Sequence, residues 1–199
     1  FRNADSRVDL SRKFGCHADM ARDLLIRARD RGLVPYGVSF HVGSQQTDLA
    51  QWDIAVGAAA MVFTTLREAG IELKLVNIGG GFPAHYRDDV AGVDDYCNAV
   101  MHAMTDHFGN DLPRMIVEPG RSLVGDSGVI DAEVVLISTK SYDPDEPRWV
   151  YLDIGKFHGL AETMDEAIKY RLKTPHDGKA TGPVVLAGPS PRVVAGEGI

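Results

Sequence analysis

The chain has 199 residues, of which 44% are hydrophobic and 25% charged, an ordinary globular composition with enough apolar material for a core. Its formal net charge of −7 argues against a general affinity for nucleic acid or for an anionic membrane surface, because both reward net positive charge. Two cysteines are too few for a disulfide scaffold, and no apolar run is long enough to span a membrane. We therefore expect a cytoplasmic protein that binds neither nucleic acid nor membrane.

The first part of the chain alternates between helical and strand-like patterns. Apolar residues recur at helical spacing from 18 to 31, and Gly32 follows as a stop. Residues 37–42 alternate in the manner of a strand and run into Gly43. Because strands separated by helices at this spacing form βα units, we predict a parallel sheet. The further helices are expected at 52–69 and 93–108, and the further strands at 73–78 and 114–118.

The pattern changes after Gly125. Residues 130–139 and 148–152 resemble strands, and no helical pattern lies between them. The acidic, proline-bearing segment 142–147 that separates them is typical of a surface turn. We predict a βα domain over residues 1–125 and a mainly β domain over residues 126–199.

Three polar or glycine-rich signals each follow a predicted parallel strand. They are His41, the glycine run 79–81 and the segment 118–121. The carboxyl ends of parallel strands in a βα barrel share one rim, where active sites are built. We therefore expect these three signals to meet in one pocket.

The glycine run and Arg121 suit an anion. Backbone N–H groups without side chains approach a phosphate closely, and a guanidinium adds a charge-assisted hydrogen bond. The alternatives are a tight turn without a ligand at the glycines and a surface salt bridge at Arg121. We expect no metal site, because no cluster of cysteine, histidine and acidic residues has metal-ligand spacing.

Glu118 and His41 suit an aromatic cofactor. Glu118 follows the apolar run 115–117, and a carboxylate at such a position is costly unless it meets a cation or a donor. A protonated ring nitrogen would satisfy it, and an ion pair with Arg121 is the alternative. The His41 ring would stack on the cofactor, whereas the alternative is a hydrogen-bonded core histidine.

Three segments resemble, in order and spacing, signatures of the ornithine/diaminopimelate/arginine decarboxylase family: Ser39–Ser44 (SFHVGS), Asn77–Pro83 (NIGGGFP) and Glu118–Arg121 (EPGR). The resemblance runs from about residue 7 to about residue 189. It implies a pyridoxal 5'-phosphate enzyme with an α/β fold, an alanine-racemase-like (βα)8 barrel followed by a β domain. The chain is then expected to hold the C-terminal part of the barrel and the start of the mainly β domain.

The resemblance also implies roles at the matching positions. His41 and Glu118 would be catalytic, His41 stacking on the pyridine ring and Glu118 keeping the ring nitrogen protonated. A protonated ring is the better sink for the electrons left at Cα when CO₂ departs. The implied phosphate ligands are Ser44, Gly81, Gly120 and Arg121, with Gly79 and Gly80 shaping the loop.

Segments 156–160 and 162–170 resemble bacterial ornithine or lysine/ornithine decarboxylases. Asp165 and Glu166 lie where the family binds the distal ammonium of a diamino acid, and solvated charges at a helix start are the alternative. The implied parent enzyme is a cytoplasmic homodimer that converts ornithine, lysine or both to putrescine or cadaverine in polyamine biosynthesis. The competing interpretations are a diaminopimelate decarboxylase-like enzyme and a non-catalytic homologue that acts as a regulatory binding protein.

The chain departs from the family pattern at both ends. The family's cofactor-bearing lysine lies upstream of Phe1, so we expect an internal segment that does not decarboxylate by itself. Residues 187–189 match the start of a family motif that continues with a cysteine, whereas Ser190 and Pro191 follow here. The presence of His41, Glu118 and Arg121 argues against a binding-only homologue, because a regulatory decoy has no need of a cofactor cradle.

Overall fold

The structure, a computed structural model, describes residues 14–166, 168–189 and 193–194. The chain divides into two compact units. Unit 1 comprises Phe1–His85 and Val90–Ser127, and unit 2 comprises Tyr86–Asp89 and Gly128–Ile199. Each unit is described by itself below.

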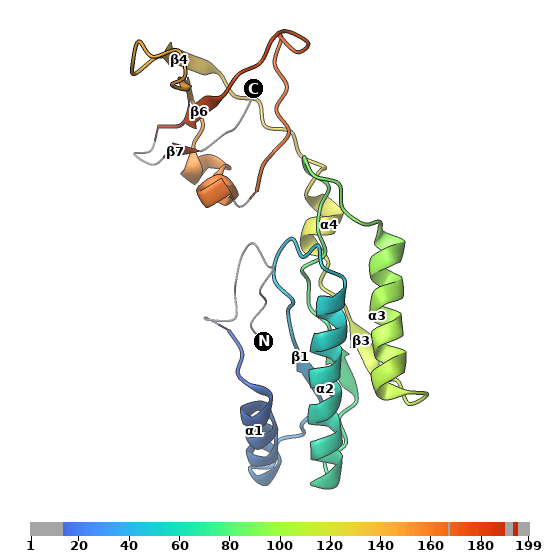
Figure 1. The fold of residues 1–199 in the computed structure, drawn as a ribbon. Helices are drawn as coiled ribbons and strands as arrows, with labels where there is room; N and C mark the ends of the chain where they lie inside the picture. Colours follow the sequence, from blue (N-terminus) through green and yellow to red (C-terminus); the bar gives the residue numbers. More distant parts are fainter. Residues whose placement is uncertain (1–13, 167, 190–192, 195–199) are drawn as a thin grey trace. The chain divides into compact units, whose positions relative to one another are not determined.

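Unit 1 alternates helices and parallel strands, as the sequence predicts. The strands pair in the order β1-β2-β3, with Val38 opposite Val76 and Val76 opposite Met115. Helix α2 lies between α1 and α3 (Figure 1). The elements are α1 (Ala18–Asp30), β1 (Gly37–Ser39), α2 (Ala50–Glu68), β2 (Leu75–Asn77), α3 (Val93–Phe108), β3 (Arg114–Ile116) and α4 (Gly120–Val124).

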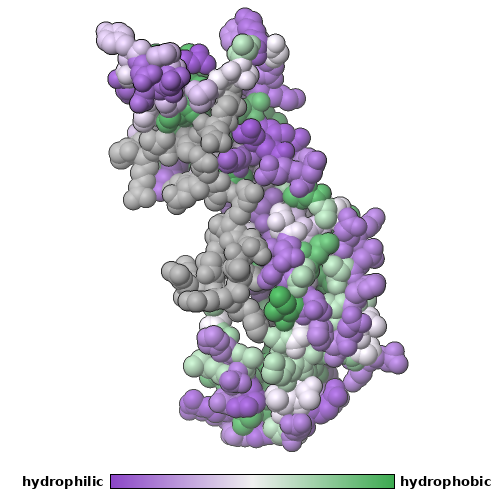
Figure 2. All heavy atoms as spheres, in the orientation of Figure 1, coloured by the Kyte–Doolittle hydropathy of each residue, from purple (hydrophilic) through white to green (hydrophobic). Residues whose placement is uncertain are grey.

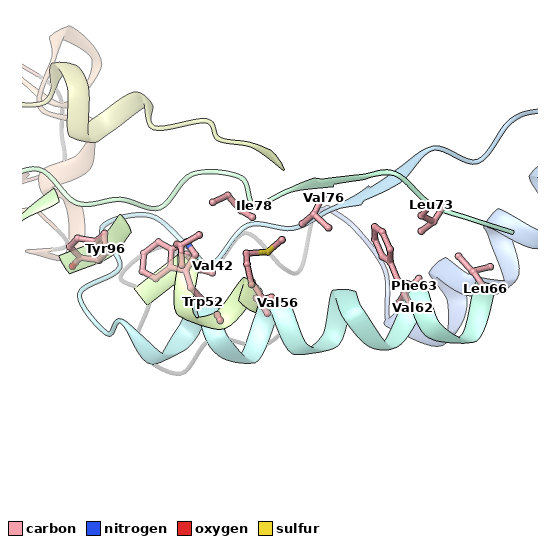
Figure 3. Close-up of a cluster of buried hydrophobic side chains, with 14 of the residues drawn as sticks. Val42, Trp52, Val56, Val62, Phe63, Leu66, Leu73, Val76, Ile78 and Tyr96 are labelled. Atoms are coloured by element: carbon pink, nitrogen blue, oxygen red, sulfur yellow. The ribbon is translucent and has the colours of Figure 1, made fainter. Parts of the chain in front are cut away.

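The core of unit 1 lies between α2 and the sheet. Nine residues of α2 are buried, and its side chains point toward the strands in Figure 3. Trp52 and Leu66, near the two ends of α2, and Val76 of β2 are fully buried. Burying a large apolar side chain contributes about 1.5–3 kcal/mol, so this helix anchors the sheet.

Successive strand residues face opposite sides of a sheet, and this alternation decides what reaches the helices. Val38 and Val76 pack with the core under the helices. Ser39, Asn77 and Ile116 are in register with one another and face the other side. β1 and β2 therefore end in polar residues, Ser39 and Asn77, on the side away from α2, whereas β3 ends there in the apolar Ile116.

The predicted helices are confirmed within two residues at each end, but the strands are shorter than predicted. Gly43 and Gly79 adopt positive φ values of 97° and 66°, which turn the chain out of the strand conformation. Some pairing continues beyond the strands, because Phe40 N–H donates to the Asn77 carbonyl at 3.0 Å. The segment that begins at Gly120 forms the short helix α4, which was not predicted from the sequence.

Unit 2 is mainly β. Its strands pair in the order β4-β5-β6-β7, antiparallel, parallel and antiparallel in turn. Val184 and Leu186 are buried against Val150, Leu152 and Leu160, so the core is small. The elements are β4 (Val134–Ser138), β5 (Arg148–Leu152), η1 (Lys156–His158), η2 (Ala161–Glu166), β6 (Val184–Ala187) and β7 (Val193–Val194).

The surface of unit 1 is mostly polar along α3. Hydrophilic residues predominate along this helix on the face drawn in Figure 2. Within the part of the chain that the structure describes, none of the helices combines the length and apolarity needed to cross a membrane.

Candidate active site

An open pocket of about 200 Å³ lies at the carboxyl ends of β1, β2 and β3. The rule that parallel strands end on one edge predicted such a meeting point, and the structure contains it. Two lining residues, Gln45 and Phe82, were not predicted. The other lining residues are His41, Ser44, Gly80, Gly81, Glu118, Gly120 and Arg121.

The glycine run lets three backbone segments approach one another. A Cβ atom on Gly79 would lie 2.1 Å from the Phe40 carbonyl oxygen, and one on Gly81 would lie 2.5 Å from that of Gly43. Both residues also have positive φ, 66° and 102°. Any side chain at either position would therefore push the neighbouring loop away and strain the backbone. Gly79 supports the pocket without lining it.

His41 has a fixed ring orientation. The Gly43 N–H donates to His41 Nδ1 at 2.9 Å, so Nδ1 carries no proton and the neutral ring is protonated at Nε2. Partial burial lowers the pKa of His41 below its ordinary value of 6.5, and the charge of Glu118 offsets part of this shift. Despite this partial burial His41 keeps an exposed surface, so it is not enclosed as a core histidine would be.

We expect His41 to make stability depend on pH. As the pH falls below 6.5, the unfolded chain binds a proton at this residue before the folded protein does, so the free energy of unfolding falls. This loss ends once the pH is below the lowered folded-state pKa. Denaturant unfolding at pH 7.5 and 5.5 should show a smaller drop for His41→Asn, whose amide oxygen replaces the Nδ1 acceptor. Equal drops in both proteins would contradict the prediction.

Glu118 is bonded to the neighbouring strand end. Asn77 Nδ2 donates to Glu118 Oε1 at 2.7 Å, and the Gly79 N–H donates to Asn77 Oδ1 at 2.9 Å. The Glu118 N–H in turn donates to the Gly79 carbonyl at 2.8 Å. These bonds join β2 to the segment after β3 at the pocket. Sequence reasoning assigned Asn77 no role, although a polar residue that ends a strand next to a glycine run is a usable signal.

Two buried glutamines join the His41 loop to the loop of the glycine run. Gln45 donates through Nε2 to the Ala84 carbonyl at 2.7 Å and accepts from the Ala84 N–H at 3.1 Å. The Gln46 N–H donates to the Gly81 carbonyl at 2.9 Å. Gln45 holds a φ of 53°, which is uncommon for a residue other than glycine. Sequence reasoning missed both glutamines, because the hydrogen bonds by which they join the two loops span more than 30 residues.

Asp165 and Glu166, predicted to contact the substrate, belong to η2 in unit 2. Their side chains lie outside the described residues. Their role stays a prediction.

The chemical groups of the residues that line the pocket fit those of pyridoxal phosphate. Bare backbone at Gly81 and the guanidinium of Arg121 suit a phosphate. The Glu118 carboxylate suits a protonated ring nitrogen, and the neutral imidazole of His41 suits the face of an aromatic ring. One pocket thus offers partners to the phosphate, the ring nitrogen and the ring face of the cofactor.

Fold and pocket together define an α/β protein with a ligand site at the carboxyl ends of parallel strands. Residues 3–125 match the family described as pyridoxal-dependent decarboxylase, pyridoxal binding domain. The chain belongs to this family, whose cofactor is pyridoxal phosphate.

Individual relatives agree with this assignment. The chain is 33% identical over 191 residues to the lysine/ornithine decarboxylase of Selenomonas ruminantium, covering 95% of this chain and 47% of that protein. It is 31% identical over 180 residues to the diaminopimelate decarboxylase of Helicobacter pylori, covering 89% and 42%. The lysine/ornithine decarboxylase of Vibrio vulnificus, solved with cadaverine, matches with a TM-score of 0.80 and 29% identity, over 96% of this chain and 52% of that one. The chain thus spans about half the length of the curated relatives that it matches.

Proposed function

We propose that this chain forms the pyridoxal phosphate cradle of a decarboxylase that converts ornithine, lysine or both to the corresponding diamine. The observation that carries this proposal is the meeting of His41, which follows β1, with Glu118 and Arg121, which both follow β3, in one pocket. Each side chain alone has an ordinary structural explanation. Their combination matches an aromatic ring with a basic nitrogen and a phosphate, the groups that pyridoxal phosphate carries.

We place the chain within a larger fold. Unit 1 supplies the C-terminal part of a (βα)8 barrel, about residues 1–125, and unit 2 begins a β domain. The exposed apolar residues of β3, Met115 and Ile116, favour this arrangement, because a parallel strand is normally covered on both faces. The Vibrio vulnificus match over 96% of the chain favours it as well.

Each residue of the cradle has a separate task. Arg121, together with Ser44 and the bare backbone at Gly81 and Gly120, binds the phosphate and fixes the position of the cofactor. Glu118 holds a proton at the ring nitrogen, and the neutral His41 ring covers one ring face and excludes water from it. When bound, pyridoxal phosphate supplies the electron sink that makes loss of CO₂ from an amino acid feasible.

We propose a diamino acid as the substrate, with Asp165 and Glu166 as partners of its distal ammonium. The lysine/ornithine decarboxylase of Selenomonas ruminantium supports this choice, and the diaminopimelate decarboxylase of Helicobacter pylori supports a second candidate, diaminopimelate. The protein would act as a cytoplasmic homodimer. Release of CO₂ from carboxyl-labelled ornithine, lysine and diaminopimelate by the full-length parent protein tests the choice. Turnover of diaminopimelate alone would exclude the diamine product.

Arg121→Ala tests the phosphate site. Because Arg121 is assigned to the phosphate only, we expect the affinity for pyridoxal phosphate to fall roughly 10- to 100-fold, the size of a charge-assisted hydrogen bond. The affinity for pyridoxal, which lacks the phosphate, should change less than threefold. Both are measured by quenching of tryptophan fluorescence.

Arg114→Ala is the matched control, because Arg114 begins the same strand, β3, at the end away from the pocket. It should leave both affinities unchanged. If Arg121→Ala lowered the affinity for pyridoxal phosphate and for pyridoxal equally, Arg121 would not be a phosphate ligand.

A further inference from the structure

Asn77 has a defined amide orientation. Its Oδ1 accepts from the Gly79 N–H at 2.9 Å, and a backbone N–H is only ever a donor, so the oxygen of the amide must face Gly79. The NH₂ group therefore faces Glu118, where Nδ2 lies 2.7 Å from Oε1. The orientation follows from the donor, not from a choice between two similar atoms.

The backbone around this pair is held without the Asn77 side chain. The Ile78 N–H donates to the Ile116 carbonyl at 3.0 Å, and the Glu118 N–H donates to the Gly79 carbonyl at 2.8 Å. These bonds fix where Glu118 leaves the strand. What they leave undetermined is the direction of its side chain, which has three rotatable bonds and is exposed.

We propose that Asn77 is a positioning residue, which holds one oxygen of the Glu118 carboxylate so that the other is presented to the ring nitrogen of the cofactor. This inference rests on the cofactor site proposed above. It assigns a task to a residue that itself does not line the pocket.

An amide suits this task better than a charged group. A lysine or arginine at position 77 would neutralise Glu118 and weaken its hold on a protonated ring nitrogen. A carboxylate would repel Glu118 unless the two shared a proton. The neutral NH₂ group orients the carboxylate and leaves its full negative charge for the ring.

A double-mutant cycle with two ligands tests the proposal. The ligands are pyridoxal phosphate and its 1-deaza analogue, which has carbon in place of the ring nitrogen. We expect Asn77→Ala to lower the affinity for pyridoxal phosphate about tenfold, the effect of losing a well-placed hydrogen bond to a charged group. The affinity for the analogue should fall less than twofold. In a Glu118→Ala background, Asn77→Ala should cause no further loss, because the carboxylate it orients is gone.

Two results would overturn the proposal. If Asn77→Ala lowered the affinity for both ligands equally, Asn77 would serve only to cap the turn at Gly79. Additive losses in the cycle would mean that Asn77 acts independently of Glu118. If the unsubstituted protein bound neither ligand, the proposed cofactor site itself would be wrong, which is a distinct outcome.

The Asn77→Ser variant separates loss of the contact with Glu118 from loss of the turn at Gly79. A serine hydroxyl accepts from an N–H two residues on, as the amide does now, but is too short to reach Glu118. Asn77→Ser should lower the affinity for pyridoxal phosphate as much as Asn77→Ala does, and its melting temperature should be unchanged. If Asn77→Ser bound pyridoxal phosphate as tightly as the unsubstituted protein, the only role of Asn77 would be to hold the turn.

Discussion

Gly80→Ala is expected to lower the affinity for pyridoxal phosphate by roughly 100-fold or more, because it displaces Glu118 and His41 together and a single hydrogen bond to a charged group is already worth about 1.5–3 kcal/mol. A Cβ atom on Gly80 would lie 2.6 Å from the Glu118 carbonyl oxygen and 3.4 Å from His41 Nε2. The first contact is with backbone, which has no rotamer by which to escape. The segment that carries Glu118 must therefore move away from the glycine run, and the His41 ring must shift with it. Titration with the cofactor, followed by tryptophan fluorescence, measures the loss.

Gly128→Ala is the matched control for Gly80→Ala. Gly128 has no heavy atom within 4 Å of a Cβ position and lies outside the pocket, so the same chemical change should leave the affinity unaltered. An affinity within threefold of the unsubstituted protein in Gly80→Ala would show that the contact at Gly80 is not needed for the cofactor. Circular dichroism of both variants separates loss of binding from loss of fold.

The framework of unit 1 could be predicted because it depends on local patterns. Helical periodicity located α1, α2 and α3, alternation located β1, and short β-prone runs located β2 and β3. The pocket followed from one further rule, that parallel strands end on a common edge. His41, the glycine run and Glu118 were each placed at a strand end by sequence, and so they met in the structure.

The rest depends on contacts between distant residues, which local patterns do not encode. Gln45 bonds to Ala84 across 39 residues, and Asn77 bonds to Glu118 across 41. Neither pairing has a periodic signature. In unit 2 the parallel pairing of β5 with β6 joins segments separated by a long connection that contains η1 and η2, and β6 was not predicted from the sequence. Residues that hold the site together were thus harder to find than residues that line it.

The pocket wall also depends on the core beneath it. Phe82 lines the pocket on one side and stacks on Trp52 on the other, with ring centroids 5.0 Å apart. Trp52 meets Tyr96 edge to face at 5.3 Å, and Tyr96 donates its hydroxyl proton to the Gln46 carbonyl. A chain of aromatic contacts therefore connects α2 and α3 to the loops that form the site.

Trp52→Ala is expected to lower the free energy of unfolding by about 3–5 kcal/mol, the usual range for removing a large buried aromatic side chain. Trp52 is fully buried in the core between α2 and the sheet (Figure 3). Its deletion removes the support of Phe82 and Tyr96 together. Such a loss is a large fraction of the stability of an ordinary domain, which is about 5–15 kcal/mol. Denaturant unfolding followed by far-ultraviolet circular dichroism measures it, since the main fluorophore of unit 1 is gone.

Two further substitutions make the Trp52 prediction specific. Trp52→Phe should lose less stability than Trp52→Ala, because an aromatic ring stays against Phe82 and the indole N–H, buried without a hydrogen-bond partner among the described residues, is removed. Trp149→Ala removes the other tryptophan, which is half-buried on β5 of unit 2, and should cost about 1–2 kcal/mol, since partly buried side chains contribute less. If Trp149→Ala destabilised the protein as much as Trp52→Ala, the core under α2 would not be the main support of the site.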